Sequence, residues 1–243
     1  MRVALCLSGL IGSKDGSYSI VHSKDYKPID CEIGFEHYKE HILSKNDVDV
    51  FVHTWSIDKK DAIMDLYKPK EVIFQKQVDF QISHINKFTV CSRWYSIMQS
   101  VNLKSLYETI HEFKYDCVMI GRFDVAWYTD VIFDNFDMQY MWVSHYNDPP
   151  NLQKGRAEAN RKNRGVGKEV LDFWFFSNSD YINRLSTLYN RLKKYPRNAH
   201  MCIHSHIKRM IGKDNIRFAF YRWFDYELIR RKILGCRDNE KNS

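Results

Sequence analysis

The chain has 243 residues, of which 44% are hydrophobic and 15% aromatic, with only 10 glycines and 5 prolines. This length and composition predict a packed globular domain and exclude a disordered or fibrous chain. The 37 lysines and arginines exceed the 30 acidic residues, and the formal net charge of +7 favours an anionic partner such as a nucleotide, a polyphosphate, a nucleic acid or an acidic membrane surface.

Apolar runs alternate with helical patterns through the first half of the chain. The predicted elements are a strand at 3–7, a helix at 34–43, strands at 48–53 and 72–74, a helix at 92–113 and a strand within 115–124. Apolar side chains at helical spacing make 92–113 the clearest helix. This order of elements predicts an α/β fold with a Rossmann-like, doubly wound and mainly parallel sheet flanked by helices.

The second half of the chain has a different character. Residues 147–168 are rich in Asn, Lys, Arg and Gly and predict a long mobile loop. A strand is expected at 170–176, helices at 179–194 and 199–211, and a disordered polar tail at 237–243. We expect one domain, because the chain is only marginally long enough for two.

The six cysteines are scattered, without a Cys-x-x-Cys pair or zinc-finger spacing. Cys6 and Cys117 lie in apolar runs that read as buried strands, where a free thiol packs as a small hydrophobe. This pattern favours a reducing compartment. The apolar stretch 3–7 is too short for a signal peptide or a membrane span, so a cytoplasmic protein without a transmembrane segment is expected.

Polar residues follow three of the predicted strands, at 8–9, 53–56 and 122–124. The carboxyl ends of parallel strands meet at one edge of a doubly wound sheet, where ligands bind. At the third strand end, the Asp124 carboxylate has the chemistry to hold a divalent cation, and Arg122 to bind phosphate. The alternative is that Arg122 and Asp124 form a surface ion pair without a ligand.

The order and spacing of five segments indicate a resemblance to a known family. These segments are 1–9, 49–55, 92–96, 115–124 and 172–177. Together they resemble a family of GT-A-type glycosyltransferases from bacteria, phages and large DNA viruses, over about residues 1 to 190. The resemblance implies a GT-A-like fold and transfer of a sugar from a nucleotide-diphosphate sugar to a glycan or other hydroxyl acceptor. It also implies a single domain at 1–236, with a nucleotide-sugar-binding half at 1–130 and an acceptor-side half at 131–236.

The resemblance implies roles for individual residues in donor binding. Ser8 and Gly9 would lie beneath the nucleotide, where glycine permits close backbone approach. Arg93 would reach from its helix toward the nucleotide-sugar. The second loop would contribute His53, Thr54 and Trp55.

Asp124 would be the last acidic residue of a degenerate Asp-x-Asp motif that holds Mn²⁺ or Mg²⁺. The sequence departs from the family pattern at Arg122, which replaces the first acidic residue and puts metal binding in doubt, since Arg122 can offset phosphate charge itself. Lys14 stands where relatives often carry Arg. Late histidines often complete the metal site of such enzymes, and His204 is the candidate here, although a packing role fits it as well.

Asp172 would face the acceptor and act as the general base of an inverting enzyme, or it would cap the following element. Basic residues of the long loop fit a lid over a diphosphate or a solvated loop: Arg156, Arg161, Lys162, Arg164 and Lys168.

Two alternatives to an active transferase remain. A nucleic-acid-binding module would explain the net charge, but the basic residues are dispersed and no nucleic-acid-binding motif is visible, so no nucleic-acid partner is expected. A catalytically silent nucleotide- or glycan-binding relative is compatible with Arg122 at the first acidic position. No phosphate-binding G-x-x-x-x-G-K-[ST] loop follows the leading strands, which argues against a kinase.

Overall fold

The computed structural model describes residues 1–12, 29–80, 88–145, 170–195 and 199–229. Its first half contains β1 (Arg2–Gly9), α1 (Cys31–Tyr38) with a π-helical turn (Lys39–Leu43), β2 (Asp47–Thr54), a 3-10 turn (Ile57–Lys59), α2 (Lys60–Tyr67), β3 (Glu71–Phe74), α3 (Phe88–Ile110), β4 (Cys117–Gly121) and β5 (Val125–Trp127). The second half contains 3-10 turns (Phe133–Asn135, Leu192–Lys194, Lys213–Asn215), β6 (Met141–His145), β7 (Phe175–Ser177), α5 (Ser179–Ser186), α6 (Leu188–Arg191), α7 (Ala199–Ile211), β8 (Ile216–Tyr221) and β9 (Tyr226–Leu228).

Within the described residues, one sheet has seven strands in the order β3-β2-β1-β4-β7-β6-β8, and β5 pairs with β9 in a separate two-stranded sheet. Strands β3, β2, β1 and β4 are mutually parallel, while β7 is antiparallel to both β4 and β6. The predicted α/β fold with a mainly parallel, helix-flanked sheet is confirmed at this level.

Strand β1 occupies the centre of the sheet because its side chains are apolar on both faces. Val3, Leu5 and Leu7 pack into one hydrophobic core, whereas Ala4 and Cys6 pack into the other. Strand β4 alternates in the same way, and the predicted burial of Cys6 and Cys117 is confirmed.

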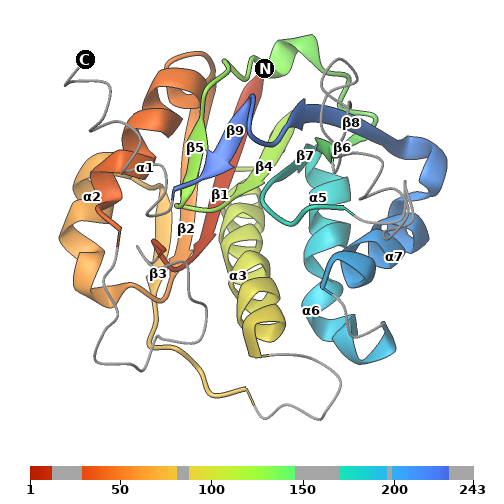
Figure 1. Cartoon of the computed structure of the whole chain (residues 1–243), viewed down its shortest axis with the longest axis horizontal. Coiled ribbons are helices and arrows are strands. Elements are labelled where there is room, and N and C mark those ends of the chain that lie inside the picture. Colours follow the sequence, from red (N-terminus) through yellow and green to blue (C-terminus); the bar gives the residue numbers. More distant parts are fainter. Residues whose placement is uncertain (13–28, 81–87, 146–169, 196–198, 230–243) are drawn as a thin grey trace, which may run out of the picture.

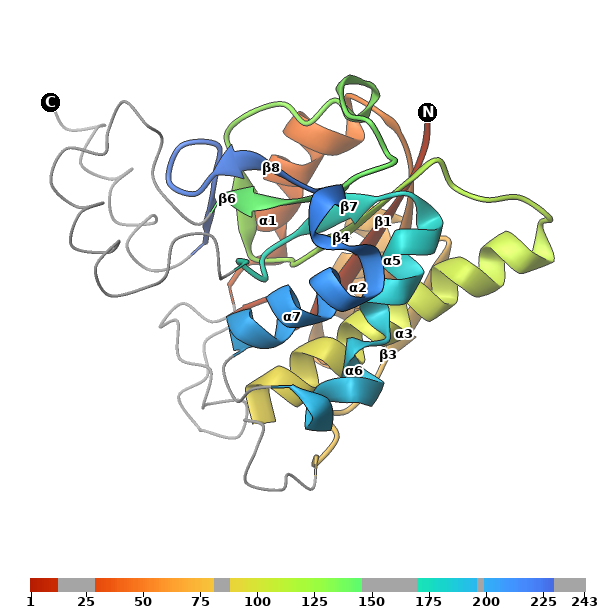
Figure 2. The same ribbon diagram turned by 90° about the vertical axis from the view of Figure 1, so that its right-hand side faces the viewer.

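Helices cover both faces of the main sheet. Helices α1 and α2 supply side chains to the core on one face, and α3, α5, α6 and α7 supply the core on the other. Figure 1 shows these two layers on opposite sides of the strands, and in Figure 2 the layer with α3, α5, α6 and α7 faces the viewer. None of the described helices combines the length and apolar character needed to cross a membrane.

Several boundaries differ from the sequence prediction. The strand expected at 170–176 begins only at Phe175, and the helix expected at 179–194 is broken near Thr187 into α5 and α6. Strands β5, β6, β8 and β9 were not anticipated. The loop at 147–168 and the tail at 237–243 lie outside the described residues.

Candidate functional site

The carboxyl ends of β1, β2 and β4 lie side by side at one edge of the sheet. In the strand register Ser8 is opposite His53, Gly9 is opposite Thr54, and Leu7 is opposite Gly121, the residue before Arg122. The predicted convergence of the three polar strand ends is therefore confirmed. The sheet order reverses direction between β1 and β4, the place where doubly wound sheets bind ligands.

Hydrogen bonds shape the loop that follows β1. Thr54 Oγ1 donates to the Gly9 carbonyl over 2.8 Å, and Ser56 Oγ accepts from the Ile11 amide over 3.2 Å. Gly9 has a φ of +99°, and no atom of the described residues lies within 4 Å of the place where its Cβ would be. The strand end therefore presents backbone with open space in front of it, and the positive φ explains why glycine is required there.

Arg93 extends from α3 to the end of β1. Its Nη1 donates to the Oγ and carbonyl oxygen of Ser8 over 2.8 and 3.2 Å, and its Nη2 donates to the Asp172 carbonyl over 3.1 Å. Burial and, to a smaller extent, the positive charge of Arg122 lower the pKa of the Arg93 guanidinium to about 10. Nε of Arg93 is buried without a hydrogen-bond partner in the described part of the chain.

Arg122 and Asp124 form a bidentate ion pair at the end of β4. Nε and Nη2 of Arg122 donate to the two carboxylate oxygens of Asp124, each over 2.7 Å. The exposed fractions of the two side chains are 12% and 7%. The alternative of an ion pair is thus realised, but the pair is mostly buried and not on the surface.

Helix α1 fixes the backbone of this strand end. The hydroxyl of Tyr38 donates to the Arg122 carbonyl over 2.8 Å. One turn earlier, a Cβ on Gly34 would lie 2.2 Å from the Phe123 carbonyl oxygen, so only glycine permits this approach of the helix. Burial raises the pKa of Tyr38 above its ordinary value, which keeps the phenol protonated as a donor.

A second ion pair lies beyond Asp172. Two guanidinium groups lie near the ring of Phe173. The distance from its ring centre to the guanidinium carbon is 5.8 Å for Arg122 and 5.1 Å for Arg222. Arg222 pairs with the buried carboxylate of Glu227 over 2.8 Å. The Phe173 ring therefore lies between two arginine groups, and the carboxylate of the preceding, half-buried Asp172 accepts no hydrogen bond from the described residues.

Two of the predicted nucleotide contacts are internal. His53 is fully buried, with Nε2 donating to Gln75 over 3.0 Å and Nδ1 lying 2.7 Å from Oγ of Ser96. Its pKa is lowered, because burial disfavours the charged ring. Trp55 stacks on Tyr95 with ring centres 5.5 Å apart. Their predicted roles as ligand contacts stay predictions, and the geometry gives both residues a packing role.

Both carboxylate oxygens of Asp124 accept from Arg122, so a divalent cation at Asp124 would have to share the carboxylate with the guanidinium. No group of three or more potential metal-ligating side chains occurs among the described residues. His204 lies on α7, and burial lowers the pKa of its ring. No contact in the described part of the chain joins His204 to Asp124, and their metal assignment remains a prediction.

Some expected residues fall outside the described ranges, namely Lys14 and the basic residues of the loop at 147–168. Sequence reasoning missed Gly34 and Tyr38, which position the strand end, and the pair Arg222 and Glu227. Gly34 and Tyr38 lie four residues apart in the predicted helix, on one helix face, and this spacing could have identified them. Arg222 and Glu227 carried no such signal because their strands were not recognised.

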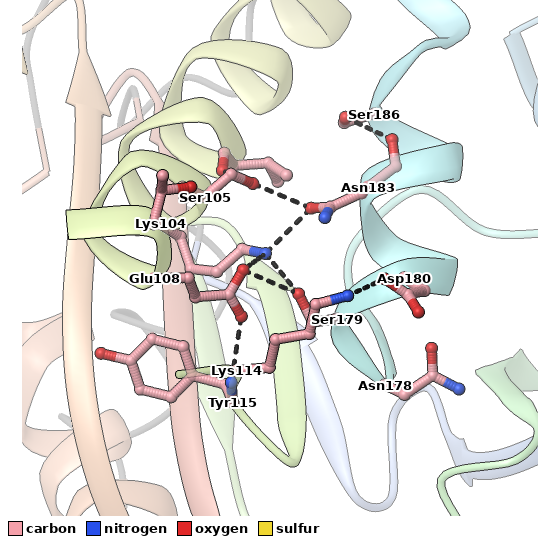
Figure 3. Close-up of polar contacts among 12 residues, drawn as sticks. Lys104, Ser105, Glu108, Lys114, Tyr115, Asn178, Ser179, Asp180, Asn183 and Ser186 are labelled. Carbon is pink, nitrogen blue, oxygen red and sulfur yellow. Dashed lines mark hydrogen bonds and ion pairs between the residues drawn. The ribbon is translucent and has the colours of Figure 1, made fainter. Parts of the chain in front are cut away.

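A buried polar network lies at the opposite edge of the sheet (Figure 3). The fully buried Lys104 of α3 donates to Glu108 over 2.9 Å, to Ser179 over 2.6 Å and to Asn183 over 2.9 Å. Glu108 in turn accepts from the Tyr115 amide, next to the start of β4. All three protons of the ammonium are used, so the network joins α3 to α5 and serves stability.

Comparison of the chain with protein-family models gives no match, and comparison with curated proteins gives none either.

Proposed function

We propose that the protein is a glycosyltransferase that uses a nucleotide-diphosphate sugar, with the donor diphosphate bound at the ends of β1 and β4. The observation that carries the proposal is the position of Arg93. Its guanidinium lies at the switch point of the sheet, and within the described residues it donates only to uncharged oxygens. A guanidinium without a carboxylate partner in a partly buried site favours an anionic ligand.

The sequence resemblance supports the sugar-nucleotide class of that ligand. The five resembling segments contribute β1, the end of β2, the first turns of α3, β4 and the residues around Asp172. Four of them meet around Arg93, because its hydrogen bonds reach Ser8 and Asp172 and its pKa is affected by Arg122 and Asp124. Open space at Gly9 leaves room for a ribose or a phosphate against the backbone.

Asp172 is the proposed general base. Its carboxylate would take the proton of the acceptor hydroxyl as that oxygen bonds to the anomeric carbon, while the bond from the anomeric carbon to the diphosphate breaks and the nucleoside diphosphate leaves. Arg93 would offset the negative charge that grows on the leaving group, an effect that raises the rate only if it is larger in the transition state than in the ground state. No step is assigned to a metal ion, since the Arg122 guanidinium already offsets the charge of the Asp124 carboxylate.

The donor site is tested by calorimetry with UDP, GDP, CDP and dTDP and their sugar conjugates. Arg93→Gln removes the charge and should weaken binding of the preferred nucleoside diphosphate by at least about tenfold, the effect of roughly 1.4 kcal/mol. Arg209→Gln on the exposed side of α7 is the matched control and should bind as the wild type does. Failure of every nucleotide to bind, or equal affinity in Arg93→Gln, contradicts the proposal.

The catalytic step is tested separately with Asp172→Asn. This substitution leaves unchanged the backbone carbonyl of residue 172 that Arg93 contacts, so donor affinity should stay near the wild-type value. The transfer rate should fall about 100-fold or more, because the side chain can no longer accept the proton. Equal loss of binding and rate assigns Asp172 to donor binding instead. Donor binding without turnover by the wild type identifies the silent nucleotide-binding relative, which the occupied Asp124 carboxylate favours.

A further inference from the structure

The turn between β8 and β9 exposes a tryptophan. Trp223 has 61% of its surface exposed, its neighbour Phe224 in the same turn 43%, and Phe218 within β8 42%. The other tryptophans of the described residues are buried or partly buried. A single exposed apolar residue is ordinary, and what distinguishes Trp223 is its backbone conformation and its charged neighbours.

The backbone at Trp223 is held in an unfavourable conformation. Its φ is +76°, a region that residues with bulky side chains rarely adopt. Phe220 in β8 also has a positive φ, at +54°, but its ring centre lies 5.6 Å from those of Trp127 and Trp174. Core packing therefore compensates Phe220, whereas no core packing compensates the exposed Trp223, and uncompensated strain is concentrated at functional positions.

Hydrogen bonds hold the turn in one shape. The Trp223 amide donates to the Tyr226 carbonyl over 2.8 Å, and the Tyr221 amide donates to Oδ2 of Asp225 over 2.6 Å. Oδ1 of Asp225 accepts from the Thr129 hydroxyl over 2.9 Å, which fixes the turn to the segment after β5. The indole is therefore presented on a rigid turn, which lowers the entropy that a ligand must overcome on binding.

A chain of contacts links Trp223 to the proposed donor site. The Arg222 guanidinium carbon lies 4.3 Å from the indole ring centre and 5.1 Å from that of Phe173. The guanidinium of Arg122, which pairs with Asp124, also lies near the Phe173 ring. Trp223 is thus linked to the site through Phe173, the residue that follows Asp172.

We infer that Trp223 is a stacking platform for a saccharide. The identification of that saccharide as the acceptor rests on the transferase reaction proposed above. A pyranose has an apolar C–H face that fits an indole and hydroxyl groups at its rim that need polar partners. The Arg222 guanidinium, held by the buried Glu227, lies over one face of the indole at 4.3 Å from its centre, and its partly exposed side chain provides a polar group at the ring while the other face is left to the sugar. Mostly apolar contact with a few fixed polar groups is typical of specific small-molecule sites.

The test uses the full chain on an array of immobilised oligosaccharides of hexoses, hexosamines and deoxyhexoses, without donor. Trp223→Gly removes the ring, and because glycine adopts a positive φ freely, the melting temperature should stay the same or rise. Phe224→Ala is the matched control, since it removes the neighbouring exposed ring. The wild type and Phe224→Ala should bind the same saccharides, and Trp223→Gly should bind them at least about tenfold more weakly.

A second readout separates this inference from the proposed function. Calorimetry with the nucleoside diphosphates should give equal affinity for the wild type and Trp223→Gly, and Trp223→Phe should restore part of the saccharide binding. If saccharide binding depends on Trp223 but the protein has no transferase activity, the inference about Trp223 is supported and the proposed transferase function is rejected. Absence of saccharide binding by the wild type, equal loss in Phe224→Ala, or weaker nucleotide binding in Trp223→Gly overturns the inference.

Discussion

The guanidinium of Arg122 contacts both carboxylate oxygens of Asp124, with each nitrogen–oxygen distance 2.7 Å, at the end of the central strand β4. The two residues are two positions apart and mostly shielded from water. Removing one partner of such a pair leaves a charge in a poorly solvated place, which is more costly than removing both.

A double-mutant cycle measures this coupling. Asp124→Asn and Arg122→Gln should each lower the free energy of unfolding by about 3 kcal/mol, because each leaves an unpaired and mostly buried charge. The double variant should lose less than the sum of the two, with a coupling of roughly 1–3 kcal/mol. Urea unfolding provides the measurement, and additive losses would show that the two side chains act independently.

The same pair determines how the protein responds to metal ions. Donor binding by the wild type should be equal in EDTA and in Mn²⁺, because the Arg122 guanidinium neutralises the Asp124 carboxylate and its positive charge repels a cation. Arg122→Ala exposes the carboxylate and should make binding dependent on Mn²⁺. Loss of wild-type binding in EDTA would instead support the metal role predicted for Asp124 and His204.

Gly34 is predicted to be essential for the shape of the site. Gly34→Ala places a methyl group against the Phe123 carbonyl, 2.2 Å away, and backbone cannot move aside as a flexible side chain can. The variant should lose about 2–3 kcal/mol of stability and also bind nucleotide more weakly. Glu36→Ala on the exposed part of α1 is the control, and a Gly34→Ala variant with wild-type stability would contradict the close approach of α1.

Lys104 is predicted to stabilise the fold without any role in ligand binding. Lys104→Met leaves Glu108 buried without its countercharge and should cost about 3–5 kcal/mol in urea unfolding. Adding Glu108→Gln removes the uncompensated charge and keeps an acceptor for the Tyr115 amide, so part of the loss should be recovered. A cost below ~1 kcal/mol would show that the ammonium is not held as the geometry indicates.

The sequence was sufficient to predict the central part of this fold. Strands β1, β2 and β4 are apolar runs with polar ends, so their parallel pairing and the meeting of Ser8, Thr54 and Asp124 at one edge follow from general rules. The helical spacing in α3 likewise predicted a helix, within a few residues of its bounds. Arg93 and Asp172 were also predicted to belong to one site, and the hydrogen bond between them places them together.

Other features depend on tertiary contacts that local patterns do not encode. Strands β5 and β9 have three residues each and exist through pairing across about a hundred residues, so neither has a recognisable period. His53 looks like an exposed strand-end residue, but Ser96 and Gln75 bind its ring in the interior. The approach of α1 to the backbone of Arg122 and Phe123 is likewise a tertiary contact that the sequence does not reveal.

Stability should depend on pH through His206. Burial lowers the pKa of its ring to about 4, and the ring contacts the Tyr195 hydroxyl over 2.9 Å. Because the folded pKa is below the unfolded value of about 6.5, the stabilisation is complete above that pH and is lost as pH falls toward 4. The loss amounts to roughly 3 kcal/mol by the linkage relation.

Urea unfolding at pH 7 and pH 5 checks this expectation. His206→Gln should reduce the difference in unfolding free energy between the two pH values, while His111→Gln at an exposed position should leave it unchanged. An equal pH dependence in wild type and His206→Gln would assign the effect to other groups.

Consumption of a nucleotide-sugar panel by the wild type and by Arg93→Gln, followed as release of nucleoside diphosphate with an oligosaccharide acceptor, tests the central claim most directly. We predict that the wild type consumes at least one donor and that Arg93→Gln does so about 100-fold more slowly, because a single lost electrostatic contact to the leaving group is worth roughly 3 kcal/mol. A wild type that consumes no donor, or an Arg93→Gln variant as active as the wild type, would contradict the account.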